Sequence, residues 1–267
     1  MIGVLDSGIG GLSVLAAIAS ILPRSELIYF ADTAHLPYGD KDDDAIRERV
    51  LRVGQYLARQ GCGQIVVACN TATAAAVAAL REALPRVGVI GVEPGIKPAA
   101  ASSKSGRIAV LATVSTARSE RLARLIRQHA GAVRVDILPC PGWATKVETL
   151  QLGDPDFAET ARRLLEPVLA AGADRVVLGC THYVFLAPLL EPIVAGRAAL
   201  VDVADAVARQ CQRLAGEIGE DGGTAARHGS LTLAASAHPE RLLKALTVLK
   251  LESLAARLSG PANLADI

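Results

Sequence analysis

Residues 61–71 read Gly-Cys-Gly-Gln-Ile-Val-Val-Ala-Cys-Asn-Thr, a short apolar run that follows glycine and ends in polar residues. This stretch aligns without gaps on residues 172–182, Gly-Ala-Asp-Arg-Val-Val-Leu-Gly-Cys-Thr-His. A second pair, Ile-Gly-Val-Leu-Asp-Ser at 2–7 and Ile-Ala-Val-Leu-Ala-Thr at 108–113, precedes the first pair at similar distances. Two matches in the same order predict two related halves, each built around buried strands that end in polar loops.

Outward from these stretches, short apolar runs rich in β-branched residues alternate with longer helical patterns almost throughout the chain. This alternation predicts the fold class α/β, with parallel-type sheets and helices on both faces. The predicted strands are residues 2–5, 27–30, 65–68, 87–92, 107–111, 133–138, 175–179, 199–203 and 231–234. The clearest helical patterns are residues 12–21, 43–60, 72–84, 117–129, 155–171 and 204–216.

Composition limits the classes of partner. The chain has 267 residues, of which 51% are hydrophobic, and a formal net charge of +1 without a long basic block. Nucleic acids and anionic membranes require clustered Lys and Arg, so neither is expected as a main partner. The most apolar run, residues 72–80, is too short to span a bilayer, and the start of the chain resembles a strand instead of a targeting signal. We therefore expect a soluble, cytoplasmic protein.

Five cysteines are scattered along the chain at positions 62, 69, 140, 180 and 211. None forms a CxxC pair, and the five histidines do not have the spacing of metal ligands, so we expect no zinc site. Disulfides are not expected in a reducing cytoplasm. Cys62, Cys140 and Cys211 are interpreted as small buried hydrophobic residues.

Cys69 and Cys180 occupy equivalent places, each at the end of an apolar strand and ahead of a predicted helix. The positive end of a helix dipole and its free N–H groups stabilise a thiolate, so each thiol is a candidate general base or, when protonated, a general acid. The alternative is that both are core residues at strand ends. A matched pair favours chemistry, because inversion at a carbon needs one group to remove a proton and another to return one on the opposite face.

Other polar residues follow strands of the same predicted sheets. Asp6-Ser-Gly-Ile-Gly-Gly11 is a glycine-rich turn after the first strand, but no Lys-Ser/Thr follows it, so it is not a P-loop. The GxGxxG spacing of dinucleotide folds is also broken, because Ser13 stands where the third glycine would be. Asp32 at the end of the second strand could still act as a ribose-binding acid, and a nucleotide-binding module remains an alternative.

Four more places carry candidate side chains, each with a structural alternative. Pro37-Tyr-Gly39 is also typical of a simple turn, and Thr113 and Thr116 offer hydroxyl groups after a strand. Glu148 by itself is typical of a solvated helix residue. His182 would more often be a packed or surface residue, but its position two residues after Cys180 favours a catalytic role.

These motifs together resemble those of bacterial glutamate racemases, in the aspartate/glutamate racemase family. The resemblance runs in order from residue 1 to about residue 210 and thins after Asp205. Where family members often have a Thr-Ser-Gly step after a strand, this chain has Ala-Ala-Ser-Ala at 234–237. The segments that carry it are residues 6–14, 37–39, 69–71, 91–99, Thr113 with Thr116, 140–148 and 180–182.

The resemblance implies a fold, an activity and roles for residues. It implies two pseudo-symmetric three-layer α/β domains with the active site in the cleft between them; we place the first at residues 1–95, completed by 206–267, and the second at 96–205. It implies interconversion of L- and D-glutamate by two cysteines, with no cofactor and no metal, in a bacterial cytoplasm, where D-glutamate supplies peptidoglycan synthesis. We also expect a homodimer. The implied catalytic residues are Cys69, Cys180, Asp6, Glu148 and His182, and the implied substrate-binding residues are Asp6, Ser7, Pro37, Tyr38, Gly39, Asn70, Thr71, Thr113, Thr116, Thr181 and His182.

Within this resemblance the roles are specific. Cys69 would take the α-proton of D-glutamate with the help of Asp6, and Cys180 would take that of L-glutamate with the help of Glu148 and His182. An aspartate or hydantoin racemase with the same paired cysteines is the nearest alternative activity.

Overall fold

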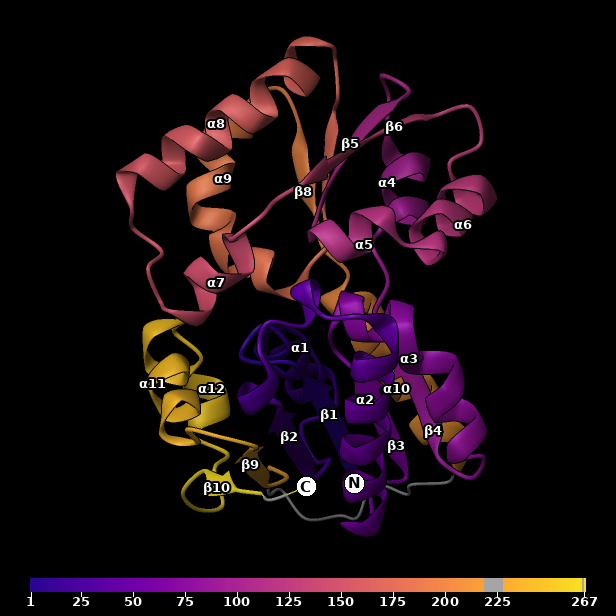
Figure 1. Cartoon of the computed structure of the whole chain (residues 1–267), viewed down its shortest axis with the longest axis vertical. Helices are drawn as coiled ribbons and strands as arrows, with labels where there is room; N and C mark the ends of the chain where they lie inside the picture. Colours follow the sequence, from indigo (N-terminus) through magenta and orange to yellow (C-terminus); the bar gives the residue numbers. More distant parts are fainter. Residues whose placement is uncertain (219–227, 266) are drawn as a thin grey trace. The chain divides into compact units, whose positions relative to one another are not determined.

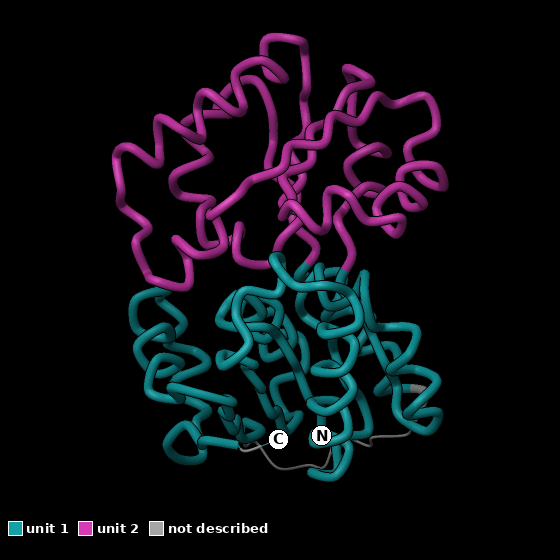
Figure 2. The backbone as a smooth tube through the Cα atoms, in the orientation of Figure 1, with its two compact units in different colours: residues 1–92, 204–267 teal, residues 93–203 magenta. Residues whose placement is uncertain are grey.

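The computed structural model describes residues 1–218, 228–265 and 267. The chain forms two compact units, one from Met1–Val92 together with Ala204–Ile267 and the other from Glu93–Val203 (Figure 2). Each unit is built on its own parallel sheet. The exact domain boundaries expected from the sequence stay a prediction, because compactness alone does not establish that a unit folds independently.

The first unit contains a six-stranded sheet in the order β10-β9-β2-β1-β3-β4, with all neighbours parallel (Figure 1). β1 is central, and both β1 and its neighbour β2 are completely buried, as expected of parallel strands that are covered on both faces. The strands are β1 (Ile2–Asp6), β2 (Leu27–Ala31), β3 (Gln64–Val67), β4 (Gly88–Gly91), β9 (Leu231–Ala235) and β10 (Asn263–Leu264).

Helices cover this sheet in two pairs. α2 (Asp43–Arg59) packs against α3 (Asn70–Ala83), and their apolar residues form one core with Leu5, Phe30 and Val67 of the sheet. Successive side chains of a strand point to opposite faces, so the neighbours of these residues need a second cover. α1 (Leu12–Ile21) and α10 (Ala204–Ile218), which pack against each other, supply it. Short elements complete the unit: η1 (Thr33–His35), η2 (Tyr38–Asp40), α11 (Glu240–Val248) and α12 (Glu252–Ala255).

The second unit contains a four-stranded parallel sheet in the order β6-β5-β7-β8. α4 and α6 pack together over β5 and β7, where Ile96, Leu122, Val110 and Val177 share a core. α8 packs against α9, and α9 contacts β8. The elements are α4 (Ile96–Ser102), β5 (Arg107–Ala112), α5 (Val114–Arg118), α6 (Glu120–His129), β6 (Arg134–Pro139), α7 (Trp143–Glu148), α8 (Pro155–Ala170), β7 (Arg175–Leu178), η3 (Thr181–Leu186), α9 (Ala187–Val194) and β8 (Ala199–Val201).

The strand orders confirm that the two halves are related. β2-β1-β3-β4 in the first sheet and β6-β5-β7-β8 in the second have the same order relative to the chain, so β1 corresponds to β5 and β3 to β7. The turns before β3 and β7 are also alike, because Gly61 and Gly172 both have a φ of 90°. This left-handed conformation favours glycine, which explains why both repeats begin with it. The predicted fold class, two parallel-sheet α/β units, is confirmed.

Two local features differ from the sequence-based expectation. The helical pattern at 117–129 is two helices, because Ser119 has an extended backbone and its hydroxyl accepts the N–H of Leu122 at 3.2 Å, which starts α6. β10 was not predicted, since two residues carry no periodicity. Among the described residues, no helix has the length and apolar character needed to cross a membrane.

Candidate active site

The carboxyl ends of β1 and β3 bring two predicted motifs together in the first unit. These strands are neighbours, so the loop after Asp6 and the residue Cys69 lie at one edge of the sheet. The Ser7 hydroxyl oxygen is 3.8 Å from the sulfur of Cys69. The Asp6 carboxylate is buried and accepts the backbone N–H of Gly8 at 2.9 Å, which orders the glycine-rich turn. Asp6 and Ser7 are therefore placed beside this cysteine by the parallel pairing itself.

Cys69 lies at the N-terminus of α3, as the sequence predicts. Its sulfur accepts the backbone N–H of Ala72 at 3.5 Å, in the place where Ser or Asp would cap a helix. A hydrogen bond to sulfur and the positive end of the helix dipole both favour the thiolate over the thiol. This arrangement suits a sulfur that exchanges a proton.

The first turn of α3 holds two buried polar residues, Asn70 and Thr71. Within the described part of the chain, the Nδ2 atom of Asn70 has no hydrogen-bond partner. A buried amide without a partner is costly, and a carboxylate ligand would satisfy it. Asn70 thus has the geometry expected of a substrate-binding donor.

The segment Pro37–Gly39 follows β2 and leads into η2, which packs against α3. The Tyr38 hydroxyl donates to the Asp32 carboxylate at 2.7 Å. Burial, the nearby charge of Asp32 and, more weakly, the Cys69 thiolate raise the pKa of Tyr38 well above its ordinary value, so the phenol keeps its proton. Because Asp32 is buried and bound by protein groups, it is not available as a ribose-binding acid, and the nucleotide-binding alternative loses its acidic residue.

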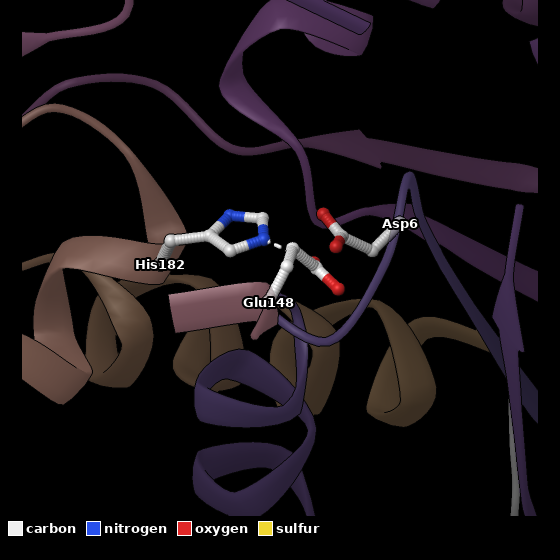
Figure 3. A group of neighbouring side chains, drawn as sticks. All are labelled: Asp6, Glu148 and His182. Carbon is white, nitrogen blue, oxygen red and sulfur yellow. Dashed lines mark hydrogen bonds and ion pairs between the residues drawn. The ribbon is translucent and has the colours of Figure 1, made fainter. Parts of the chain in front are cut away.

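In the second unit, the residues after β7 form a cluster with α7. The Nδ1 atom of His182 is 3.6 Å from the sulfur of Cys180, and its Nε2 atom is 2.5 Å from the Glu148 carboxylate. Figure 3 shows the His182 ring and the Glu148 carboxylate directed toward each other; Asp6, also drawn, belongs to the first unit. Residues far apart in sequence thus form one chain of polar contacts ending at a thiol.

Aromatic packing positions this cluster. The Trp143 ring of α7 meets Phe157 of α8 with centroids 5.1 Å apart and Tyr183 of η3 at 5.6 Å, both edge to face. Such contacts add to the burial energy of the rings and fix their relative orientation. They therefore hold α7, which ends in Glu148, against the segment that carries His182.

His182 is buried, and its polar neighbours favour its protonated form. Burial by itself lowers the pKa of His182, but the hydrogen bonds and charges of Cys180 and Glu148 raise it well above the ordinary value of 6.5. An imidazolium cation beside Cys180 stabilises the thiolate of that residue. The result is an acid–base group of the same type as Cys69, obtained from different neighbours.

The expectation of two equivalent helix N-termini is only half correct. Cys180 precedes η3, a 3-10 helix, and its side chain caps no backbone N–H there. The 3-10 turn places the His182 ring beside the sulfur. Beside Cys180, the His182 ring takes the place that the backbone N–H of Ala72 has beside Cys69.

Thr113 and Thr116 follow β5, the neighbour of β7. The Thr113 oxygen accepts the backbone N–H of Thr116 at 3.2 Å and donates to the hydroxyl of Thr116 at 3.0 Å. Thr113 therefore caps α5. Thr181, a third candidate hydroxyl, is buried at the start of η3.

The other three cysteines have the character of core residues. All five cysteines are free and buried. Burial raises the pKa of Cys62 to about 11 and the pKa of both Cys140 and Cys211 to about 12. These thiols are protonated at neutral pH, because burial outweighs the groups that favour their thiolates, such as the N-terminus near Cys62.

Arg49 is a residue near the first edge that the sequence analysis did not single out. It is buried on α2 and forms a two-bond ion pair with Asp32. A buried carboxylate at the end of a strand, such as Asp32, needs a positively charged partner, and this need is the signal that could have pointed to an arginine nearby. Among the arginines of α2, Arg49 has the spacing that places it on the apolar face, three residues after Ile46.

Comparison with known proteins gives the family. The family model described as Asp/Glu/Hydantoin racemase matches residues 2–211. A glutamate racemase of Pseudomonas putida is 46% identical over 248 residues, which cover 93% of each chain. The structure of Escherichia coli glutamate racemase with L-glutamate and the activator UDP-MurNAc-Ala superposes with a TM-score of 0.83 at 30% identity, covering 99% of this chain and 97% of that one. A glutamate racemase of Bacillus anthracis gives 0.85 at 28% identity, covering 100% and 97%. The chain therefore belongs to the Asp/Glu/Hydantoin racemase family and, within it, to the glutamate racemases, which are isomerases.

Proposed function

We propose that this enzyme interconverts L- and D-glutamate by a two-base reaction in which Cys69 and Cys180 exchange protons with the α-carbon. The observation that carries the proposal is the equivalence of β3 and β7, each followed by a cysteine whose sulfur lies beside a polar group, the Ala72 N–H for Cys69 and the His182 ring for Cys180. Substrate and product are mirror images, and a pair of matched bases on related scaffolds suits that symmetry. The relatives named glutamate racemase support the choice of substrate.

In the proposed reaction both thiols change protonation state. Starting from D-glutamate, the Cys69 thiolate takes the α-proton, so a C–H bond breaks and an S–H bond forms. The Cys180 thiol gives its proton to the opposite face, so its S–H bond breaks and the new C–H bond gives L-glutamate. The reverse reaction begins with Cys69 protonated and Cys180 as thiolate. Atoms and charges balance with no cofactor and no metal.

The α-proton of an amino acid is very weakly acidic, so the site has to stabilise negative charge in the transition state by preorganised donors. We propose that Asn70, with its available buried amide, is one such donor. Asp6 assists Cys69, and the Glu148–His182 pair assists Cys180 by holding a positive charge beside it. The remaining proposed substrate-binding residues are Ser7, Pro37, Tyr38, Gly39, Thr71, Thr113, Thr116 and Thr181.

The biological role we propose is the supply of D-glutamate for peptidoglycan synthesis in a bacterial cytoplasm, and through it a role in cell wall formation and cell shape. A homodimer is part of the proposal. Sedimentation of the purified protein over a concentration series tests the dimer independently of activity.

The decisive experiment follows deuterium from heavy water into glutamate without added cofactor, after dialysis against EDTA and hydroxylamine. The wild-type enzyme should racemise L-glutamate and label both enantiomers. L-Aspartate, assayed separately as the alternative substrate, should not be racemised. Cys180→Ala should not racemise, yet it should exchange the α-proton of D-glutamate, and Cys69→Ala should exchange that of L-glutamate. Full racemisation by either variant would refute the two-base mechanism, and exchange into the opposite enantiomers would refute the assignment of faces.

A further inference from the structure

Asp32 collects hydrogen bonds from several segments of the first unit. Its Oδ2 atom accepts the Tyr38 hydroxyl at 2.7 Å and the Nε of Arg49 at 3.0 Å, while its Oδ1 atom accepts the NH2 group of Arg49 at 2.9 Å. The Nδ1 atom of His35 lies 3.1 Å from the same Oδ1. Burial alone would raise the pKa of Asp32, but the hydrogen bonds from Arg49, Tyr38 and Ser236 lower it, so the carboxylate stays ionised.

The C-terminal segment takes part in this network. β9 pairs with β2, which puts Ser236 next to the loop after Asp32. Besides its bond to Asp32, the Ser236 hydroxyl accepts the backbone N–H of Ala34 at 3.0 Å. Arg49 also donates to the backbone carbonyl of Ile267 at 3.0 Å. Residues from the end of the chain thus support the loop that leads from Asp32 to Tyr38.

The direction of the Tyr38 hydrogen bond decides what the phenol can do. A hydroxyl has one proton, and Tyr38 donates it to a carboxylate that holds it strongly. The ring is buried and shares the core of α2 and α3 with Cys69. Tyr38 is therefore an anchor that attaches its segment to the sheet, and its hydroxyl has no proton left to donate to a substrate carboxylate.

We propose that Asp32, held by Arg49 and Ser236, is a positioning residue for the substrate segment Pro37–Gly39, and that it acts through the hydroxyl of Tyr38. This inference rests on the proposed function, in which that segment binds glutamate on the Cys69 side. It also assigns a task to the part of the chain where the resemblance to the family thins, because Ser236 belongs to that part. The network controls substrate binding more than proton transfer.

The test is a double-variant cycle measured by racemisation kinetics in both directions. Tyr38→Phe keeps the ring and removes only the hydroxyl, and we expect its KM for glutamate to rise on the order of three- to tenfold, with kcat changed about twofold or less. Asp32→Asn should raise KM as well, because either orientation of the amide puts an NH2 group against an Arg49 nitrogen. Ser236→Ala should give a smaller rise in KM.

Coupling is the result that a purely structural role would not produce. If Asp32 acts through Tyr38, adding Asp32→Asn to Tyr38→Phe should cause no further increase in KM. The proposal would be overturned if the KM increases of the two single variants multiplied in the double variant. A wild-type KM for Tyr38→Phe would also overturn it. Where Asp32→Asn does not fold, the Ser236→Ala and Tyr38→Phe pair gives the same cycle.

Two control variants separate positioning from stability. Tyr56→Phe removes a hydroxyl from the same unit, where the ring packs edge to face on Phe30 at 5.4 Å, and should leave KM unchanged. Asp174, just before β7, accepts hydrogen bonds from the Ser103 hydroxyl and from the backbone N–H groups of Lys104 and Ser105. Asp174→Asn should therefore lower the melting temperature without changing KM. Absence of glutamate racemisation by the wild-type enzyme would instead overturn the proposed function, so the two failures are distinguishable.

Discussion

Alkylation by iodoacetamide should divide the five cysteines into two classes. At pH 8 a thiol reacts through its thiolate, and burial raises the pKa from 9.0 to about 11 for Cys62 and to about 12 for Cys140 and Cys211. Two and three pKa units lower the thiolate fraction about a hundredfold and about a thousandfold, while the greater nucleophilicity of a more basic thiolate restores part of the rate. The net slowing is about tenfold for Cys62 and roughly 40-fold for the other two.

Cys69 and Cys180 should react first, because the Ala72 N–H and the His182 cation favour their thiolates. The assay is a time course of labelling read by mass spectrometry, with and without D-glutamate. Cys62 and Cys69 share the tryptic peptide between Arg59 and Arg81, so fragment ions must assign the label. D-Glutamate should protect only Cys69 and Cys180. Equal labelling of all five cysteines, with no effect of substrate, would refute the reasoning.

Two further predictions concern the supports of these cysteines. A Cβ at Gly11 would lie 2.8 Å from the Asp6 Cβ and 2.9 Å from the Ala68 Cβ, so Gly11→Ala should cost about 1–3 kcal/mol of stability by overpacking and lower the activity by displacing Asp6. The control is Gly63→Ala, because the space around Gly63 is open. Equal melting temperatures of the two variants would contradict this account. The raised pKa of His182 stabilises the folded state fully below pH 6.5, and that contribution is lost as pH rises through the raised value. Glu148→Gln removes a charge that favours the cation, so the alkaline limb of kcat/KM for L-glutamate should move to lower pH; an unmoved limb would show that His182 does not govern it.

The parts of the fold that the sequence predicted are those set by local pattern. The strands that carry both cysteines are continuous apolar runs with a glycine before them and polar residues after, which is typical of buried parallel strands. The sulfur cap at Cys69 is also local, since it joins residues three apart. Helical spacing places Arg49 on the apolar face of α2, three residues after Ile46 and four before Val53, whereas Arg47 and Arg52 lie off that face. Its partner Asp32 could not be found in this way, because the pair is joined only by tertiary packing. Ser236 lies 204 residues from Asp32, and no local signal connects them.

The first unit is assembled from two segments of the chain that are separated by the whole second unit. During synthesis β2 therefore emerges long before β9, its partner strand. At about 5–20 residues per second, roughly 10–40 s pass between Asp32 and Ser236. Throughout that interval one edge of the nascent sheet presents unpaired N–H and C=O groups that can join with other chains. Glu93–Val203 is continuous in sequence. If it folds during this interval, a ribosome-bound chain should acquire its Cys180 cluster before the support of its Cys69 loop is complete.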